Sequence, residues 1–147
     1  MKNIRLTRLF TFEMAHALDG YDGKCRHIHG HSYTLYVTVI GLPCNDVSNP
    51  KYGMVMDFGE LKAVVNKNIV DRLDHTLLLH SGAVLGEELE KHYGNIVYVN
   101  YQPTCENMLL EFANILKKEL PEYVKLYSLR LHETATSFAE WYANDNE

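Results

Sequence analysis

Residues 25–31 carry the side chains of this chain that are best suited to chemistry. They place one cysteine and three histidines around Gly30, directly before the strand-like residues 32–40. On an extended backbone, side chains two positions apart project to the same face of the strand. His29 and His31 should therefore point together, and Gly30 has no side chain to obstruct an ion between them. This spacing predicts that the two histidines share one metal ion.

A third ligand is needed, because a catalytic zinc site takes three protein ligands and keeps one position open. His16 is the best candidate, since it ends the first strand-like segment, residues 4–15. We therefore expect His16, His29 and His31 to bind one Zn²⁺. His27 shares the alternation and could also be a ligand, and we interpret it as a residue that lies behind the ligands or faces the substrate.

Cys25 lies four residues before His29, in the glycine- and charge-rich loop of residues 19–26. The thiolate is the reactive form of cysteine, and nearby cations favour it. Lys24, Arg26 and a zinc ion would all act in this way. Two interpretations stay open: a reactive thiolate beside the metal, and a fourth zinc ligand in a closed structural site.

Further candidate residues lie at the ends of the two predicted helices. Asp74 directly precedes His75 at the end of the first predicted helix, and a carboxylate can fix the tautomer of a histidine and raise its basicity. A histidine at this place also suits the negative end of the helix dipole without any function. Glu106 begins the second predicted helix, where an acid is favoured on the same electrostatic ground.

Glu133 is in phase with three apolar residues of the last long strand-like segment, Tyr127, Leu129 and Leu131. A carboxylate on a buried face is costly unless it is paired. A ligand that presents two adjacent N–H donors would satisfy it in a bidentate, charge-assisted pair. The alternative is an exposed residue just past the end of the strand.

The composition limits the class of protein. The chain has 147 residues, enough for one domain, residues 1–147, with a sizeable core. The net charge of −5 and the lack of a basic block argue against a nucleic-acid partner. No apolar run reaches the ~20 residues that span a bilayer. Three widely spaced cysteines, an odd number, indicate free thiols in a reducing compartment. We expect a cytoplasmic protein that does not enter a membrane.

The hydrophobic patterns predict an α+β fold with a four-stranded antiparallel sheet and two helices on one face. The strands are expected at residues 4–15, 32–41, 125–133 and 137–142. One helix should begin at Asp57, with Glu60 completing a capping box, and a second should run from Thr104 to Pro121. Residues 81–100 are ambiguous, with a helical turn at 87–92 and a short strand at 95–100. The second sheet face is polar but suited to partial burial, which suggests pairing with other subunits around a wet interior.

Six motifs in order resemble the 6-pyruvoyl-tetrahydropterin synthase and 6-carboxy-tetrahydropterin synthase family, and the resemblance covers nearly the whole chain. They are F-E-M-A-H (12–16), C-x-x-x-H-G-H-S-Y (25–33), M-D-F-G-E-L-K (56–62), L-D-H (73–75), P-T-C-E-N (103–107) and H-E-T (132–134). The resemblance implies the tunnelling fold, in which sheets from three subunits close into a barrel and two trimers stack to a hexamer.

The resemblance also implies roles for individual residues. Zinc would be held by His16, His29 and His31. Cys25 would be the general base, with Asp74 and His75 as its relay. Glu133 would anchor the pterin through its 2-amino group and N3–H, and Thr104 and Glu106 match a motif that helps to hold the pterin, often from a neighbouring subunit. The substrate would be 7,8-dihydroneopterin triphosphate.

Spacing within the second motif favours one reaction of the family. Three residues separate Cys25 from His29, as in the bacterial carboxy enzymes of queuosine biosynthesis, whereas the mammalian pyruvoyl enzymes have a longer spacer. We therefore expect a zinc-dependent lyase that releases acetaldehyde and triphosphate and leaves 6-carboxy-tetrahydropterin. The runner-up is 6-pyruvoyl-tetrahydropterin synthase, which keeps the side chain. Two other classes are a zinc hydrolase, although no H-E-x-x-H occurs, and a non-catalytic pterin- or purine-binding module with structural zinc.

Overall fold

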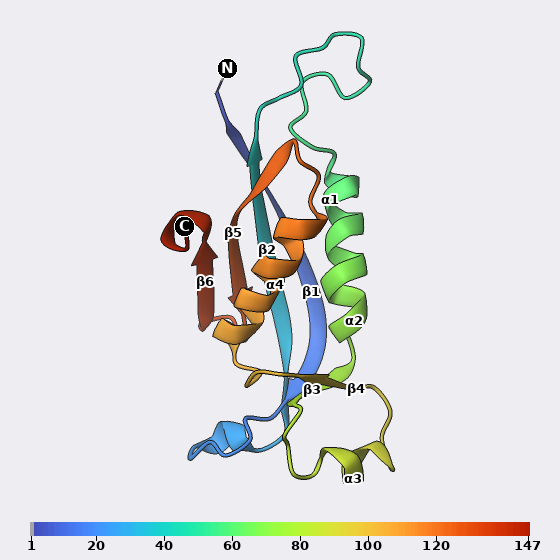
Figure 1. The fold of residues 1–147 in the computed structure, drawn as a ribbon, viewed down its shortest axis with the longest axis vertical. Coiled ribbons are helices and arrows are strands. Elements are labelled where there is room, and N and C mark those ends of the chain that lie inside the picture. The colour runs from blue at the N-terminus through green and yellow to red at the C-terminus, as the bar shows by residue number, and fades with distance from the viewer. Residues whose placement is uncertain (1) are drawn as a thin grey trace.

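The computed structural model describes residues 2–147 and has an α+β architecture. A single sheet of six strands has the order β4-β3-β1-β2-β5-β6. The two long helices, α1 and α4, cover one face of this sheet (Figure 1). The α+β class with helices on one face is therefore as predicted, but the expectation of four strands is wrong.

The centre of the sheet is a long antiparallel pair. β1 (Ile4–His16) and β2 (His29–Gly41) pair over their whole length, with His16 opposite His29. Alternate residues of both strands point to the helices, so that each strand has one buried apolar face. These buried residues are Phe10, Phe12 and Met14 of β1, and Tyr33, Leu35, Val37 and Val39 of β2. His16 continues the buried series of β1, and His29 and His31 continue that of β2.

β5 (Val124–His132) and β6 (Phe138–Tyr142) extend the sheet on one side, both antiparallel. The register with β2 shifts between Thr38 and Val39, where a bulge adds a residue to β5. Leu126 therefore takes the buried position and Tyr127 turns to the other face, where the Arg5 guanidinium lies 3.9 Å from its ring centre. The expectation that Tyr127 shares a face with Leu129 and Leu131 is wrong for this reason.

The two strands beyond the expected four lie on the other side of β1. β3 (Thr76–His80) runs parallel to β1, and β4 (Ile96–Val99) runs parallel to β3. β4 confirms the short strand that residues 95–100 suggested, and a short helix, α3 (Gly86–Glu90), confirms the helical turn. The unexpected strand is β3, which follows the first helix almost directly and has no polar alternation.

The helices begin where their capping residues indicated. α1 (Phe58–Val65) begins after Asp57, whose side chain accepts a hydrogen bond from the Gly59 N–H. It continues through a π-helical turn, Asn66–Val70, into α2 (Asp71–Leu73). The reciprocal half of the expected capping box is absent from the described residues, because the Glu60 carboxylate instead pairs with Lys51 at 2.9 Å. α4 (Cys105–Glu119) begins after Thr104, whose hydroxyl accepts from the Asn107 N–H.

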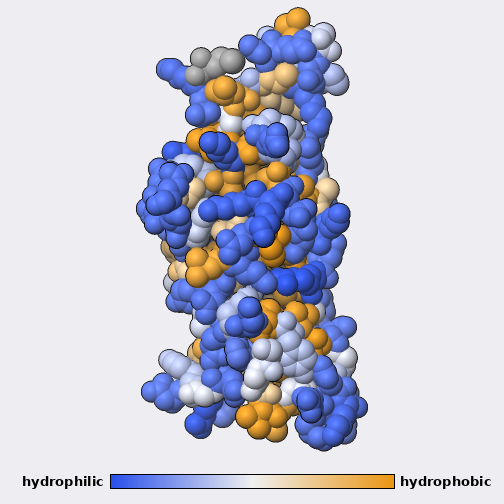
Figure 2. All heavy atoms as spheres, in the orientation of Figure 1, coloured by the Kyte–Doolittle hydropathy of each residue, from blue (hydrophilic) through white to orange (hydrophobic). Residues whose placement is uncertain are grey.

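The apolar faces of α1 and α4 pack on the buried side of the sheet and form the core, which includes Leu61, Val65, Phe112 and Leu116. Hydrophilic side chains cover most of the outer helical face, with smaller hydrophobic patches between them (Figure 2). Within residues 2–147, no helix has the length and apolar character needed to cross a membrane.

Candidate metal centre and substrate cavity

Three histidines meet where the core face of the β1–β2 pair ends. Because His16 lies opposite His29 in the antiparallel register, and His31 lies two residues further along β2, their rings gather on one side of the sheet. One ligand nitrogen from each of the three lies within 4.8 Å of the other two. The structure thus brings together all three residues that were expected to bind zinc.

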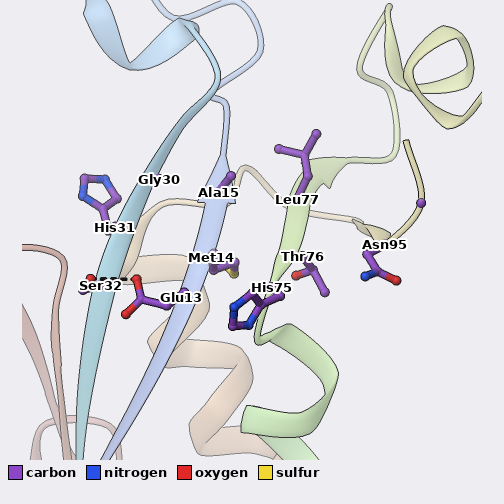
Figure 3. Close-up of a pocket in the computed structure, with 11 residues that line it drawn as sticks. Glu13, Met14, Ala15, Gly30, His31, Ser32, His75, Thr76, Leu77 and Asn95 are labelled. Carbon is purple, nitrogen blue, oxygen red and sulfur yellow. Dashed lines mark hydrogen bonds between the residues drawn. The ribbon is translucent and has the colours of Figure 1, made fainter. Parts of the chain in front are cut away.

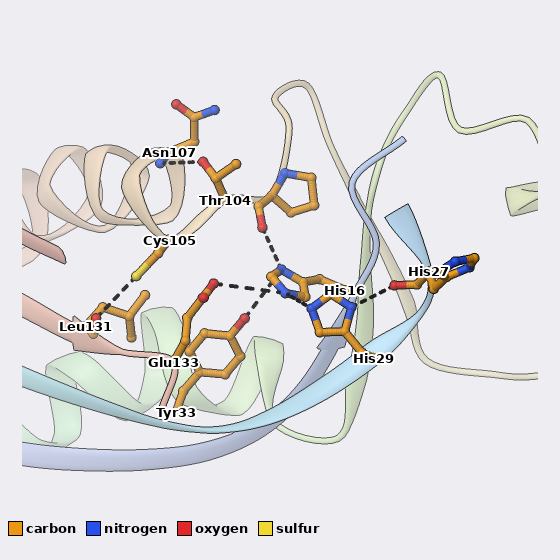
Figure 4. A network of polar contacts seen from close by, with 10 residues as sticks. His16, His27, His29, Tyr33, Thr104, Cys105, Asn107, Leu131 and Glu133 are labelled. Atoms are coloured by element: carbon orange, nitrogen blue, oxygen red, sulfur yellow. Dashed lines mark hydrogen bonds and ion pairs between the residues drawn. The ribbon is translucent and has the colours of Figure 1, made fainter. Parts of the chain in front are cut away.

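Two backbone carbonyls fix the orientation of these rings. Nδ1 of His16 lies 2.7 Å from the carbonyl oxygen of Pro103, and Nδ1 of His29 lies 2.7 Å from that of His27 (Figure 4). A carbonyl oxygen can only accept, so each Nδ1 carries the proton and each Nε2 presents a lone pair. This is the arrangement in which metal-binding histidines are held in proteins.

The resulting lone pairs suit a cation. The Nε2 atoms of His16 and His29 face each other at 3.0 Å, and two lone pairs at this distance repel each other unless a proton or cation lies beside them. Nε2 of His31 is buried and has no hydrogen-bond partner among the described residues. Three imidazoles whose ligand nitrogens converge in this way match the donor set of a three-histidine zinc site.

Burial favours the neutral form of two of these imidazoles. His16 is only 2% exposed, and burial, helped by the neighbouring His29 and His31, lowers its pKa to about 4. Burial also lowers the pKa of His31. A histidine must be neutral to bind a metal, so His16 and His31 are in the binding form at neutral pH. The buried ring of Tyr33 closes the site on the core side, with its hydroxyl 3.4 Å from Nδ1 of His16.

A cavity of about 370 Å³ opens beside His16. Four of the other expected site residues line it, all from one chain: Cys25, Thr104, Glu106 and Glu133. Thr104 and Glu106 come from the start of α4, and Glu133 follows the end of β5. Cys25 is exposed and comes from the short 3₁₀ turn Lys24–Arg26 in the loop between β1 and β2.

Glu133 points toward the histidines. Its carboxylate lies 4.0 Å from Nε2 of His16, and its side chain is 28% exposed (Figure 4). The alternative of a fully exposed residue past the strand end is therefore wrong. A ligand that is held by Glu133 would lie next to the three histidines.

The two cysteines of this cavity differ in their chemistry. Cys105 is buried, its thiol lies 3.2 Å from the Leu131 carbonyl, and burial raises its pKa to about 12. A thiol of this kind stays protonated and unreactive. Cys25 is exposed at the cavity wall, so it is the thiol of this cavity that a substrate can reach.

Asp74 and His75 do not line the cavity beside His16. His75 lines a second cavity, of about 480 Å³, together with Glu13 and Ser32. His31 of β2 lines this second cavity as well (Figure 3), whereas Cys25, Asp74 and His75 do not share a cavity. Within one chain, the structure therefore does not bring this pair into the cavity that Cys25 lines.

The connection to β1 holds the Asp74–His75 pair in place. The Asp74 carboxylate accepts from the Glu13 N–H at 2.8 Å, and the His75 N–H donates to the Glu13 carbonyl at 2.6 Å. The Glu13 N–H lowers the pKa of Asp74, so this carboxylate is charged at neutral pH. It lies 3.1 Å from Nδ1 of His75, as a carboxylate that orients a histidine should. His75 has a positive φ of 60°, which a residue with a side chain rarely adopts.

Sequence reasoning missed the groups that orient the ligands. The carbonyls of Pro103 and His27 are backbone groups, which every residue has, so the residue type does not indicate their role. Ser32 donates to Glu13 at 2.7 Å in the second cavity. The sequence did contain a signal for this pair, since Glu13 lies in the motif of residues 12–16 and Ser32 in the motif of residues 25–33.

Comparison with known proteins gives a consistent result. Residues 5–144 match the family model described as 6-pyruvoyl tetrahydropterin synthase. A 6-carboxy-5,6,7,8-tetrahydropterin synthase of Haemophilus influenzae is 36% identical over 143 residues, which cover 93% of this chain and 97% of that protein. The protein of the same name from Rickettsia bellii is 33% identical over 141 residues, covering 93% and 99%.

Solved structures share the fold. An uncharacterized protein from Wolinella succinogenes superposes with a TM-score of 0.80 at 21% identity, covering 97% of this chain and 99% of the other. The 6-pyruvoyl tetrahydropterin synthase of Caenorhabditis elegans superposes with a TM-score of 0.70 at 24% identity, covering 97% of both chains. On the evidence of its sequence, its fold and the residues gathered in its cavity, this chain belongs to the 6-pyruvoyl tetrahydropterin synthase family.

Proposed function

We propose that this protein is a zinc-dependent lyase that converts 7,8-dihydroneopterin triphosphate to 6-carboxy-5,6,7,8-tetrahydropterin, with release of acetaldehyde and triphosphate. The observation that carries the proposal is the three-histidine centre, whose His16 lines a cavity that also holds an exposed thiol and a carboxylate. The names of the Haemophilus and Rickettsia relatives support the choice of substrate and product.

His16, His29 and His31 would hold the zinc ion through their Nε2 atoms. The carbonyls of Pro103 and His27 keep the protons of two of these rings on Nδ1. When bound, Zn²⁺ supplies Lewis-acid polarisation of oxygens on the substrate side chain. The chain itself contributes three converging imidazoles on one side and the open cavity on the other.

Glu133 would bind the pterin. Its carboxylate can accept two hydrogen bonds from the adjacent 2-amino and N3–H donors of the ring, and among the described residues no lysine or arginine pairs with it, the contact with His16 being to a neutral ring. Thr104 and Glu106 line the same cavity and would contact the ring from the start of α4. A pterin held in this way would direct the three-carbon side chain of the substrate toward the histidines and the thiol.

Cys25 would move protons on the substrate side chain as a general base, with Asp74 and His75 as its relay. Because Cys25 and His75 line different cavities of one chain, we propose that the relay comes from a second chain. Exposure supports this arrangement, since the His75 side chain is 75% and the Asp74 side chain 40% exposed. We therefore propose a homo-oligomer, a trimer or a hexamer of two trimers, whose sites form between subunits.

The runner-up is 6-pyruvoyl-tetrahydropterin synthase, which eliminates triphosphate and keeps the side chain. A Drosophila melanogaster protein named 6-pyruvoyl tetrahydrobiopterin synthase is 30% identical over 141 residues, covering 88% of this chain and 73% of that protein. Both reactions would use the same zinc ligands, base and anchor. The short spacer between Cys25 and His29 favours the carboxy reaction.

The proposal is tested by triphosphate release from 7,8-dihydroneopterin triphosphate. We expect turnover by the zinc-loaded protein and none after zinc is removed, with recovery when zinc is returned. A non-catalytic pterin-binding module would bind the substrate without releasing triphosphate.

Mixed oligomers test the shared site. Cys25→Ala and His75→Ala should each be inactive alone. After the two are unfolded and refolded together, about a quarter of the sites should regain both residues if each site combines two chains of a symmetric oligomer. Activity that stays absent in the mixture, while the mixed oligomers form, would contradict a relay from a second chain.

A further inference from the structure

Asn107 ends the motif P-T-C-E-N, and none of the roles proposed above includes it. We propose that Asn107 is a positioning residue: it holds the Pro103 carbonyl beside Nδ1 of His16 and thereby keeps the proton of the neutral ring on Nδ1, so that Nε2 is free for the metal centre. The inference rests on the proposed three-histidine centre and adds a residue that touches neither metal nor substrate.

Asn107 ties the segment before α4 into a closed turn. Its side-chain amide donates to the Gln102 carbonyl at 3.0 Å, and its backbone N–H donates to the Thr104 hydroxyl at 3.2 Å. The Thr104 N–H donates to the same Gln102 carbonyl at 2.7 Å. The residues on both sides of Pro103 are therefore fixed by bonds that converge on one carbonyl and on the first turn of α4.

Pro103 depends on these neighbours for its orientation. Proline has no N–H, so it cannot anchor itself through a backbone donor. Its carbonyl oxygen nevertheless lies 2.7 Å from Nδ1 of His16, in the buried part of the site (Figure 4). The Asn107 amide holds the carbonyl of the preceding Gln102–Pro103 peptide from the helix side, while the Gln102 side chain donates to the Asp19 carbonyl at 2.8 Å.

The Pro103 carbonyl determines the tautomer of His16. With the Pro103 carbonyl in place, the neutral His16 ring keeps its proton on Nδ1 and offers Nε2. If the carbonyl moves away, the other tautomer becomes accessible, and its Nε2 carries a proton and cannot bind a metal. Loss of a direct partner of a metal-bound histidine typically weakens metal binding about 10- to 100-fold, and we expect about tenfold here, because Asn107 acts through an intervening turn.

The test uses Asn107→Asp, which keeps the size of the side chain but replaces the donor by an acceptor that repels the Gln102 carbonyl. The helix should survive, because an acid in the first turn of α4 suits the helix dipole and the backbone bond to Thr104 is unchanged. Asn68→Asp is the matched control. The Asn68 amide donates to the Val64 carbonyl at 2.8 Å, a bond of the same kind outside the candidate site.

Two readouts separate positioning from general stability. The first is the tautomer of His16 in the zinc-free protein at pH 8, by nitrogen-resolved NMR of the imidazoles. The second is zinc affinity by competition with a chelator. We expect the wild type and Asn68→Asp to keep the Nδ1–H tautomer and equal affinity. Asn107→Asp should show a tautomer mixture and an affinity about tenfold lower.

Wild-type tautomer and affinity in Asn107→Asp would overturn the inference, whatever happens to its unfolding midpoint. If Asn107→Asp does not fold, Asn107→Ala removes the donor without adding charge and is judged by the same two results. If the wild-type protein binds no zinc, the proposed metal centre fails, and the NMR measurement still decides whether Asn107 positions His16.

Discussion

Burial of neutral His16 makes the stability of the zinc-free protein depend on pH in a direction that the structure specifies. The pKa of His16 falls from 6.5 to about 4, chiefly because burial disfavours the charged ring. In the unfolded chain the same ring titrates near its usual value of about 6.5. Between these two values the unfolded chain binds a proton that the folded protein does not, so lower pH favours unfolding.

The size of the effect follows from the two pKa values. Above pH 6.5 the ring is neutral in both states, and burying it costs no proton. As the pH falls from 6.5 toward 4, the free energy of unfolding decreases, because the unfolded ring binds a proton that the folded ring does not. At pH 5 the unfolded ring is almost fully protonated and the folded ring is mostly neutral, which corresponds to about 2 kcal/mol less free energy of unfolding than at pH 7.5.

Urea unfolding of the zinc-free protein at pH 7.5 and pH 5 measures this loss. His16→Asn is the matched variant, since its amide can still donate to the Pro103 carbonyl but does not titrate. Comparison of the wild type with this variant also removes the contributions of other titrating groups, including His31, whose pKa is lowered as well. We expect the wild type to lose about 2 kcal/mol more than the variant between the two pH values. An equal loss in both proteins would refute the neutral, buried state of His16.

Three substitutions probe the proposed site. Cys25→Ala should keep zinc and fold but lose most turnover, whereas loss of zinc would favour the closed structural site in which Cys25 is a fourth ligand. Glu133→Gln keeps the shape of the side chain and replaces one acceptor by a donor, so pterin binding, measured by titration calorimetry, should weaken by roughly 1.5–3 kcal/mol; unchanged affinity would remove Glu133 as the anchor. His75→Asn should lose turnover without loss of thermal stability, because asparagine tolerates the positive φ of 60° at this position better than histidine; a clearly lower melting temperature would show that the histidine side chain stabilises the fold.

Much of the fold could be predicted because its signals are local. The apolar alternation of Tyr33 to Val39 indicated a half-buried strand, and these positions are buried. Asp57 and Thr104 cap the two long helices where a side-chain acceptor was expected. The grouping of His29 and His31 follows from the period of a strand alone.

The features that could not be predicted depend on distant parts of the chain. β3 consists of a continuous apolar run around Leu78, and such a run does not distinguish a strand from the end of a helix. The bulge that turns Tyr127 outward is set by the register between β2 and β5. Likewise, Cys25 lies in the loop that joins β1 to β2 and His75 directly precedes β3, and spacing in the sequence does not show that the two line different cavities.

The ratio of acetaldehyde to triphosphate tests the central claim most directly. The zinc-loaded protein is incubated with 7,8-dihydroneopterin triphosphate, and both products are quantified over the same time course, with Cys25→Ala as the inactive control. The proposed reaction releases one acetaldehyde for each triphosphate and leaves 6-carboxy-5,6,7,8-tetrahydropterin. Triphosphate released without acetaldehyde, with accumulation of 6-pyruvoyl-tetrahydropterin, would contradict the carboxy reaction and establish the runner-up.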